Sequence, residues 1–256
     1  MKSLLALLKK EIIEHIRTGK LLILSLIFIL LGIMNPAVAK LTPWFLEIFA
    51  SSLEGSGIIV TEITVSAMDS WVQFFKNIPI GLIVFVFLQS NIFTKEYQSG
   101  TLILTLTKGI ERFKIVISKG VMLFALWSAL YWLCFGITYA YNAYFWDNGI
   151  AQNLVFSVVC WWLFGMWIIS LLILFSSLAS SNTVVLAMSG GVALVSYLLG
   201  VIPKFNKFLP TMLTDSNSLI YGSSESEGYI SALAVAIIVT LICFFASIPL
   251  FNKKQL

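Results

Sequence analysis

The chain has 256 residues, of which 59% are hydrophobic and 11% charged, with a formal net charge of +4 and a mean hydropathy of +0.96. Soluble domains average about 45–50% apolar and about 25% charged residues. The composition therefore excludes an ordinary soluble domain, a disordered chain, a coiled coil and collagen, and it indicates a membrane protein. The three cysteines lie inside apolar runs without CxxC spacing, which excludes a disulfide framework and a cysteine metal site.

Six apolar runs are each long enough to cross a bilayer, which takes about 20 helical residues. They are continuous rather than alternating, which predicts helices instead of the strands of a barrel. The expected fold is an all-α membrane protein, a single transmembrane domain over residues 1–256. The predicted spans cover about 21–39, 74–93, 120–141, 153–178, 183–202 and 229–250.

The basic residues predict the orientation of these spans. If the N-terminus lies inside, the inside segments hold all of the 16 lysines and arginines except Lys40, Lys76, Lys204 and Lys207. The positive-inside rule then places both termini in the cytoplasm of a plasma membrane, which we expect to be bacterial. The sequence at 37–39 also has the A-x-A form of a signal-peptidase site, but the long basic region before it favours a first span that is retained.

Residues 1–19 are predicted to form an amphipathic helix at the cytoplasmic surface. At about 100° per residue, one face is apolar and the opposite face is polar and basic. The single histidine, His15, falls on the apolar face, where we expect it to pack rather than to catalyse. The apolar face holds Leu4, Leu5, Leu8, Ile12 and Ile16, and the opposite face holds Ser3, Lys10, Glu14 and Arg17.

The stretch 94–119 is the longest predicted cytoplasmic segment. A polar start is followed by Gly100, by Thr101 as a plausible N-cap, and by a short apolar patch that includes Leu104 and Leu106. The glycine at 109 follows as a helix-ending residue. Such a short helix, held between two spans, can bind a soluble partner and transmit its movement, although a merely structural loop is the alternative.

The order Glu96, Gly100-Thr101, Leu104, Arg112, Lys119 resembles the segment between the second and third spans of ABC-2 type transporter permeases. The six spans, the termini on one side and the amphipathic N-terminal helix also resemble this family, whose architecture is that of type V exporters. The short six-span permeases of peptide-toxin and antimicrobial-peptide exporters are the most similar in appearance. The resemblance implies that the segment couples to an ATPase through Glu96, Gly100, Thr101, Leu104, Leu106, Glu111, Arg112 and Lys119.

The resemblance also implies the partners. A separate cytoplasmic ABC ATPase would bind ATP and Mg²⁺, while this chain would bind no cofactor or metal and would not itself be an enzyme. The sequence agrees, because it contains no phosphate-binding GxxxxGK[ST] loop. The other expected partners are the lipid bilayer, a second permease copy or paralogue and a peptide cargo, with no nucleic acid.

Two further groups of residues are hypotheses about the membrane interior. Trp127, Trp161 and Trp162 are expected to lie deeper than an interfacial aromatic belt, and Tyr131 is grouped with them as a candidate for the substrate path. They either pack in the core or form an aromatic wall along a substrate path. Ala187 and Gly191 form a small-xxx-small pair, which predicts a dimer interface on the fifth span.

Together these features predict the permease subunit of an exporter that moves hydrophobic or amphipathic peptides out of the cell. The alternative is a non-transporting membrane protein, such as an immunity or assembly factor that sequesters a peptide without ATP. A neighbouring gene for an ATPase would favour the first function.

Overall fold

The computed structural model describes residues 2–52, 64–107 and 109–254. Every regular element within these ranges is a helix, which confirms the predicted all-α class. Six helices in the described part of the chain are long and apolar enough to cross a membrane. They are α2 (Lys20–Ser52), α3 (Ala67–Gln89), α6 (Arg112–Phe145), α7 (Leu154–Leu178), α8 (Asn182–Gly200) and α11 (Ile230–Lys253).

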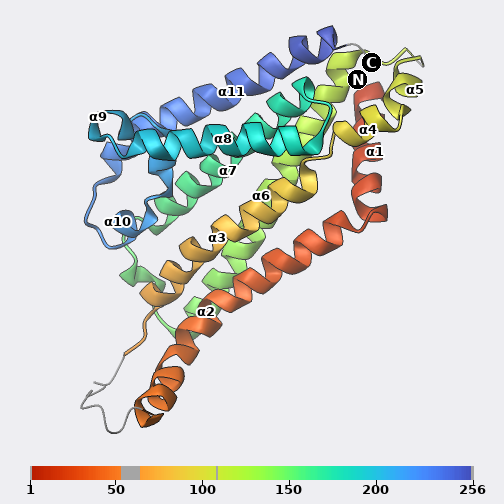
Figure 1. Cartoon of the computed structure of the whole chain (residues 1–256). Helices are drawn as coiled ribbons and strands as arrows, with labels where there is room; N and C mark the ends of the chain where they lie inside the picture. Colours follow the sequence, from red (N-terminus) through yellow and green to blue (C-terminus); the bar gives the residue numbers. More distant parts are fainter. Residues whose placement is uncertain (1, 53–63, 108, 255–256) are drawn as a thin grey trace.

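Short helices lie at the two ends of this bundle. One end carries α1 (Lys2–Arg17), α4 (Thr94–Gln98) and α5 (Thr101–Thr107), and the first and last described residues lie there too (Figure 1). We refer to it as the α1 end. The helix α1 crosses the bundle instead of continuing α2 (Figure 1). The connections toward the opposite end form η1 (Asn148–Ile150), α9 (Pro203–Asn206), η2 (Pro210–Thr214), α10 (Ser216–Ile220) and η3 (Ser226–Tyr229).

The helix α7 is the most buried span, and α8 is the least buried. Since α7 carries no charged residue and is apolar on all sides, it can be surrounded by other helices, and it contacts α6, α8 and α11. The contact with α6 depends on Gly165. A Cβ at this position would lie 2.3 Å from atoms of the Trp127 indole, so only glycine lets the two helices approach this closely.

A polar cluster inside the bundle joins α2, α3 and α6. Pro36 has no N–H, so the carbonyl of Gly32 lacks its usual helical donor. The Thr138 hydroxyl donates to that carbonyl at 3.0 Å. The Asn35 amide donates to Thr138 Oγ1 at 3.0 Å, and the Asn77 amide donates to Asn35 Oδ1 at 2.9 Å. Bonds of this kind hold helices together in lipid, where apolar contact gives little driving force.

The predicted boundaries are wrong for three of the six spans. The span expected at 21–39 is α2, which continues to Ser52, and the span expected at 74–93 begins at Ala67 and ends at Gln89. Ser66 and Asp69 form a capping box that starts α3. Much of the segment 40–73, which was expected to connect the first two spans, is therefore helical. Residues 53–63, which include the Gly-Ser-Gly sequence at 55–57, lie outside the described residues.

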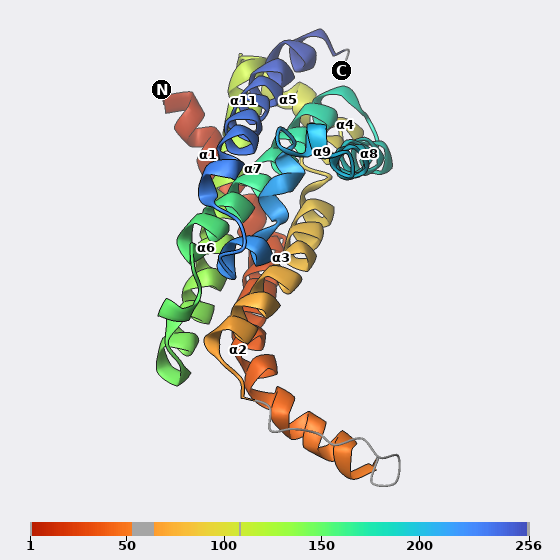
Figure 2. The same ribbon diagram turned by 90° about the vertical axis from the view of Figure 1, so that its left-hand side faces the viewer.

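The third predicted span, 120–141, is the central part of α6, which begins at Arg112. The segment 94–119 is therefore two short helices followed by the first two turns of α6. At about 1.5 Å per residue, α2 and α6 are each roughly 50 Å long, which exceeds the hydrocarbon thickness of about 30 Å. The end of α2 farthest from α1 projects beyond the other helices (Figure 2).

Candidate functional site

The inner face of α1 brings charged side chains into contact with the bundle. Leu7, Glu11 and His15 follow one another at intervals of four residues, so they lie on one face of the helix, and all three are buried. The chain turns between α1 and α2 at Gly19, whose φ of 70° is in the left-handed region that favours glycine. This turn lets α1 fold back against α6.

A buried lysine lies at the centre of the α1 end. The ammonium of Lys119, in the second turn of α6, is 3.0 and 3.1 Å from the two carboxylate oxygens of Glu11. It is also 3.2 Å from Oε1 of Glu96 on α4. Lys10 Nζ donates to that same Glu96 oxygen at 2.5 Å. We name Lys10, Glu11, Glu96 and Lys119 the charge network; it joins α1, α4 and α6.

The charges within the network balance, with two carboxylates against two ammonium groups. Burial lowers the pKa of Lys10, but the hydrogen bond to Glu96 and the negative charges of Glu96, Glu11 and Glu14 outweigh it and raise that pKa. Lys10 therefore keeps its positive charge at neutral pH. A buried ammonium without such partners would be strongly unfavourable, so the arrangement of the three helices depends on all members of the network.

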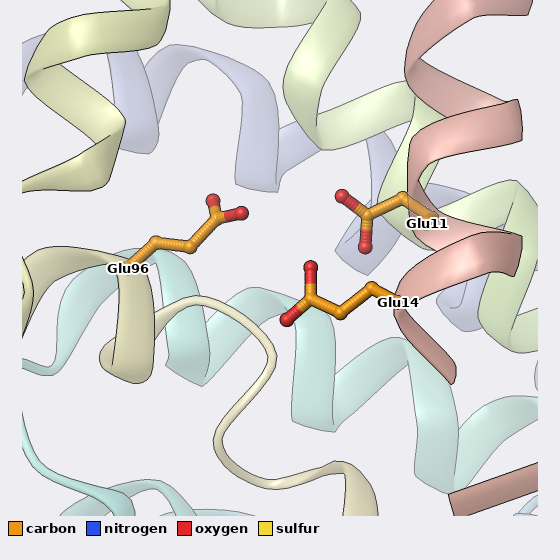
Figure 3. Close-up of side chains that lie close together, drawn as sticks. All are labelled: Glu11, Glu14 and Glu96. Carbon is orange, nitrogen blue, oxygen red and sulfur yellow. The ribbon is translucent and has the colours of Figure 1, made fainter. Parts of the chain in front are cut away.

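Three carboxylates approach one another at this site, and their geometry could suit a cation. Oxygens of Glu11, Glu14 and Glu96 lie within 4.8 Å of one another. Figure 3 shows the side chains directed into the space between α1 and α4. Lysines occupy their coordination positions, however: Lys119 and Lys10 contact Glu11 and Glu96, and Lys95 lies 3.6 Å from Glu14. The structure thus neutralises the carboxylates with protein ammonium groups.

The buried imidazole of His15 adds a link to α3. Its Nδ1 donates to the Glu11 carbonyl at 2.9 Å, and its Nε2 lies 3.0 Å from Oε1 of Gln89, the last residue of α3. Next to it, Lys20 at the start of α2 donates to Asn91 Oδ1 at 2.5 Å. Five helices therefore meet within this small volume: α1, α2, α3, α4 and α6.

The structure brings together only part of the predicted coupling set. Glu96 and Lys119, 23 positions apart in the sequence, share the network. Gly100, with a φ of 67°, separates α4 from α5. Thr101 is the first residue of α5 and not its N-cap, because the helix already includes it and Gly100 precedes it.

The helix α5 presents a small apolar surface. Leu102 is buried, Leu106 packs against the core, and Ile103 is exposed. Ile103 lines a concave surface of about 250 Å³ together with residues of α4, the turn after α7 and the end of the chain. The side chain of Leu104, and Lys108, lie outside the described residues, and Gly109 has the left-handed φ, 77°, of a helix-ending glycine.

Glu111 and Arg112 lie apart from the charge network. Glu111 pairs with Lys114 on the surface. The Arg112 guanidinium donates to the carbonyl of Asn252, in the last turn of α11, at 3.1 Å and to that of Lys254, just after the helix, at 2.8 Å. These hydrogen bonds hold the segment at the end of α11 against the start of α6.

Two members of the predicted aromatic wall belong to the core instead. Trp127 and Tyr131 are fully buried. The Trp127 indole donates to the Trp162 carbonyl at 3.1 Å, and the Tyr131 hydroxyl donates to the Val158 carbonyl at 2.7 Å. Because helix packing already covers both rings, neither can contact a substrate in this conformation.

Trp161 has a different environment, in an apolar groove of about 490 Å³ between α3, α7 and α8. Its indole N–H is buried and has no hydrogen-bond partner among the described residues. None of the lining residues in the described part of the chain is charged. The lining comprises Pro79, Leu82, Ile83, Val86 and Phe87 of α3, Trp161, Phe164 and Ile168 of α7, Leu186, Ser189, Gly190, Ala193 and Tyr197 of α8, and Thr214.

The remaining predicted residues, Trp162, Ala187 and Gly191, do not line this groove. Trp162 is half-buried, and its indole donates to Ser128 Oγ at 3.0 Å. Ala187 and Gly191 are exposed on α8, and no heavy atom lies within 4 Å of a Cβ built at Gly191. This glycine therefore has no packing role within its own chain.

The sequence analysis missed Glu11, which holds the buried lysine. A signal for it exists: at about 100° per residue, Glu11 falls within 20° of Leu4 on the helical wheel. An acidic residue beside the apolar face of an otherwise basic helix needs a buried cation as its partner. Lys119, one of the basic residues close to the third apolar run, is the natural candidate.

Replacing the buried lysine tests the network. Lys119→Met leaves two apposed carboxylates without their central cation, and we expect it to destabilise the fold by about 3–5 kcal/mol. The measurement is thermal unfolding of the purified chain in detergent. The matched control is Lys114→Met, which removes a surface pair worth at most about 1 kcal/mol. Equal unfolding temperatures for the two variants would contradict the proposed role of Lys119.

Comparison with known families gives one match and one negative result. The family model described as ABC-2 family transporter protein matches residues 5–256, nearly the entire chain. No curated protein matches the sequence significantly. Members of this family are membrane components of transporters that work with an ATPase subunit. With its six apolar helices, the chain belongs to the ABC-2 transporter family and is a multi-pass membrane permease of an ABC transporter.

Proposed function

We propose that this permease exports hydrophobic or amphipathic peptides, driven by separate cytoplasmic ABC ATPase subunits that bind ATP and Mg²⁺. The observation that carries the proposal is the uncharged groove between α3, α7 and α8. It lies between three apolar spans, and its volume of about 490 Å³ matches that of a site for an organic ligand or a few peptide side chains.

The chemistry of the groove favours an apolar cargo. Transfer of a bare ion or a phosphate from water into the groove is strongly unfavourable, because no opposite charge in the groove would replace its hydration. A peptide helix could place apolar side chains against the apolar lining of the groove, which includes Phe87 and Phe164. At one end, the Tyr197 hydroxyl donates to Thr214 Oγ1 at 3.3 Å and so narrows the groove.

The α1 end is the proposed site of energy coupling. Most lysines and arginines gather at this end, so the positive-inside rule places it, with both termini, in the cytoplasm. The exposed Ile103 and the concave surface beside it offer an apolar contact for an ATPase. Movement of α4 would reach α6 directly, because Glu96 bonds to Lys119.

Two copies, or this chain with a related permease, are proposed to form the complete path. The helix α8 is the least buried span and carries Ala187 and the unobstructed Gly191. A second α8 could approach closely at these residues. The groove, which α8 borders on one side, would then face the interface between the copies.

The docking proposal predicts the effect of a charge at Ile103. Ile103→Asp would bury a carboxylate in an apolar contact, so we expect ATPase binding to weaken by about 2 kcal/mol or more, roughly 30-fold. Co-purification with the ATPase and a binding titration measure the effect. Ile103→Val is the matched control and should bind normally. Undiminished binding by the aspartate variant would refute docking at α5.

The cargo proposal predicts that filling the groove blocks transport. No heavy atom lies within 4 Å of a Cβ at Gly190, so Gly190→Phe can place its ring in the groove without a backbone clash. We expect amphipathic peptides to stimulate ATP turnover by the wild-type complex but not by this variant. Val192→Phe is the control, because Val192 is exposed and lies about 100° or more around α8 from Gly190 and from Gly191. Peptide binding without any effect on ATP turnover in the wild-type complex would support the sequestration alternative.

The interface proposal predicts cross-links between copies. In a chain whose native cysteines are replaced, Ala187→Cys should cross-link two copies, and adding Gly191→Leu should reduce the yield, since close packing of this kind contributes on the order of 1 kcal/mol. Ile242→Cys, exposed on α11, serves as the comparison. Efficient cross-linking at Ile242 with none at Ala187 would place the interface elsewhere.

A further inference from the structure

The outer face of α1 is apolar even though the inner face already packs against the bundle. Leu5 is 63% exposed, Ile12 45% and Ile16 58%. They lie together on the helix, about 120° around its axis from the buried face that carries Glu11. A helix that exposes such a stripe and stands beside six membrane spans is suited to lie at the boundary between headgroups and acyl chains.

Beside this stripe lies a basic surface of α1. It is lined by Lys9, Lys10 and Arg17, with Ala6 and Ile13 between them. Its one acidic lining residue, Glu14, is paired with Lys95 of α4. Among the described residues no ion pair involves Lys9 or Arg17, and both side chains are exposed.

We propose that this surface binds the headgroup of an anionic phospholipid. The phosphate would lie between Lys9 and Arg17, within reach of Lys10, and the acyl chains would cover the stripe of Leu5, Ile12 and Ile16. Two features together favour a lipid over a soluble anion. Unpaired basic groups attract any phosphate, but only a lipid also covers the adjoining apolar stripe.

Lipid binding would act on the charge network, and this consequence rests on the proposed function. Lys10 contributes both to the basic surface and to the network, where it donates to Glu96. Because Glu11 lies on the same helix, fixing α1 at the membrane surface also fixes the carboxylate that holds Lys119. An anionic lipid would thus stabilise the arrangement of α1, α4 and α6 on which coupling depends.

Lipid retention by the full chain tests the site without the ATPase. The chain is purified from nanodiscs of equal parts phosphatidylcholine and phosphatidylglycerol, and the lipids that remain bound are counted by native mass spectrometry. We expect preferential retention of phosphatidylglycerol. In Lys9→Gln/Arg17→Gln the preference should fall by roughly tenfold or more, because each basic residue at an anionic surface contributes on the order of a fivefold preference.

Two control variants and one competitor make the result specific. Lys204→Gln/Lys207→Gln removes the same charge near α9 and should keep the preference. The charge-conserving Lys9→Arg/Arg17→Lys should keep it too. Excess inorganic phosphate should not displace the lipid. Equal retention of the two lipids by the wild-type chain, an unchanged preference in the double glutamine variant, or complete displacement by phosphate would each overturn the proposal.

A second measurement separates this inference from the proposed function. ATP turnover by the assembled complex is compared in nanodiscs with and without phosphatidylglycerol, and we expect peptide stimulation to be larger with it. Equal retention of the two lipids by the wild-type chain would refute the lipid site, whatever the turnover shows. Preserved preference without any peptide stimulation would instead refute peptide export and leave the lipid site intact.

Discussion

One buried ammonium group determines how the α1 end is built. Lys119 is 2% exposed in the second turn of α6. Removing an ammonium from water costs several kcal/mol unless opposite charges and hydrogen bonds replace the water. Glu11 provides two of these contacts and Glu96 a third, so α1 and α4 must both lie against α6. The position of each helix is then determined by electrostatics as well as by apolar packing.

The same helix connects this end to the rest of the bundle. From Lys119, α6 continues to Trp127, whose indole meets Gly165 of α7, and to Thr138, which bonds to the Gly32 carbonyl of α2. The packing around Trp127 leaves no space for a larger residue at Gly165, so α6 and α7 cannot shift independently there. In the proposed cycle, a displacement of α4 by the ATPase would therefore reach the groove through α6 and α7.

The groove and the charge network differ in chemical character, as expected if the groove binds cargo and the network couples the helices to the ATPase. The network consists of paired charges at one end of the bundle, whereas the groove has an uncharged lining and one unpartnered indole N–H. Paired charges have few alternative arrangements, because each separation costs electrostatic energy. Apolar surfaces with few directional bonds can accept different side chains. Export of varied amphipathic peptides would require a rigid end that couples to the ATPase and a groove that accepts different side chains.

The sequence predicted the fold class and the number of spans, because runs of apolar residues long enough to cross lipid are a strong local signal. The sequence did not predict correctly where several of the helices begin and end. Nothing in the hydropathy at 112–119 shows that α6 already begins at Arg112, since charged residues normally mark the end of a span.

The contacts of the candidate site were only partly predictable. Resemblance to a family singled out Glu96 and Lys119, but their contact depends on α1 folding back at Gly19. Whether a tryptophan packs in the core or lines a groove was likewise not predictable. Trp127 and Trp161 lie in similar apolar sequences, and only tertiary packing distinguishes them.

The central claim is that α1, α4 and the start of α6 form one unit that stays together while the proposed ATPase drives transport. A cross-link between α1 and α4 tests it most directly. Glu14→Cys and Lys95→Cys replace a pair 3.6 Å apart outside the four-residue network, and a short bifunctional thiol reagent can join them. With the ATPase bound, the account predicts that peptide-stimulated ATP turnover after cross-linking equals that of the same variant before cross-linking. Loss of that turnover, restored by cleaving the cross-link, would show that α1 and α4 separate during the cycle and would contradict the account.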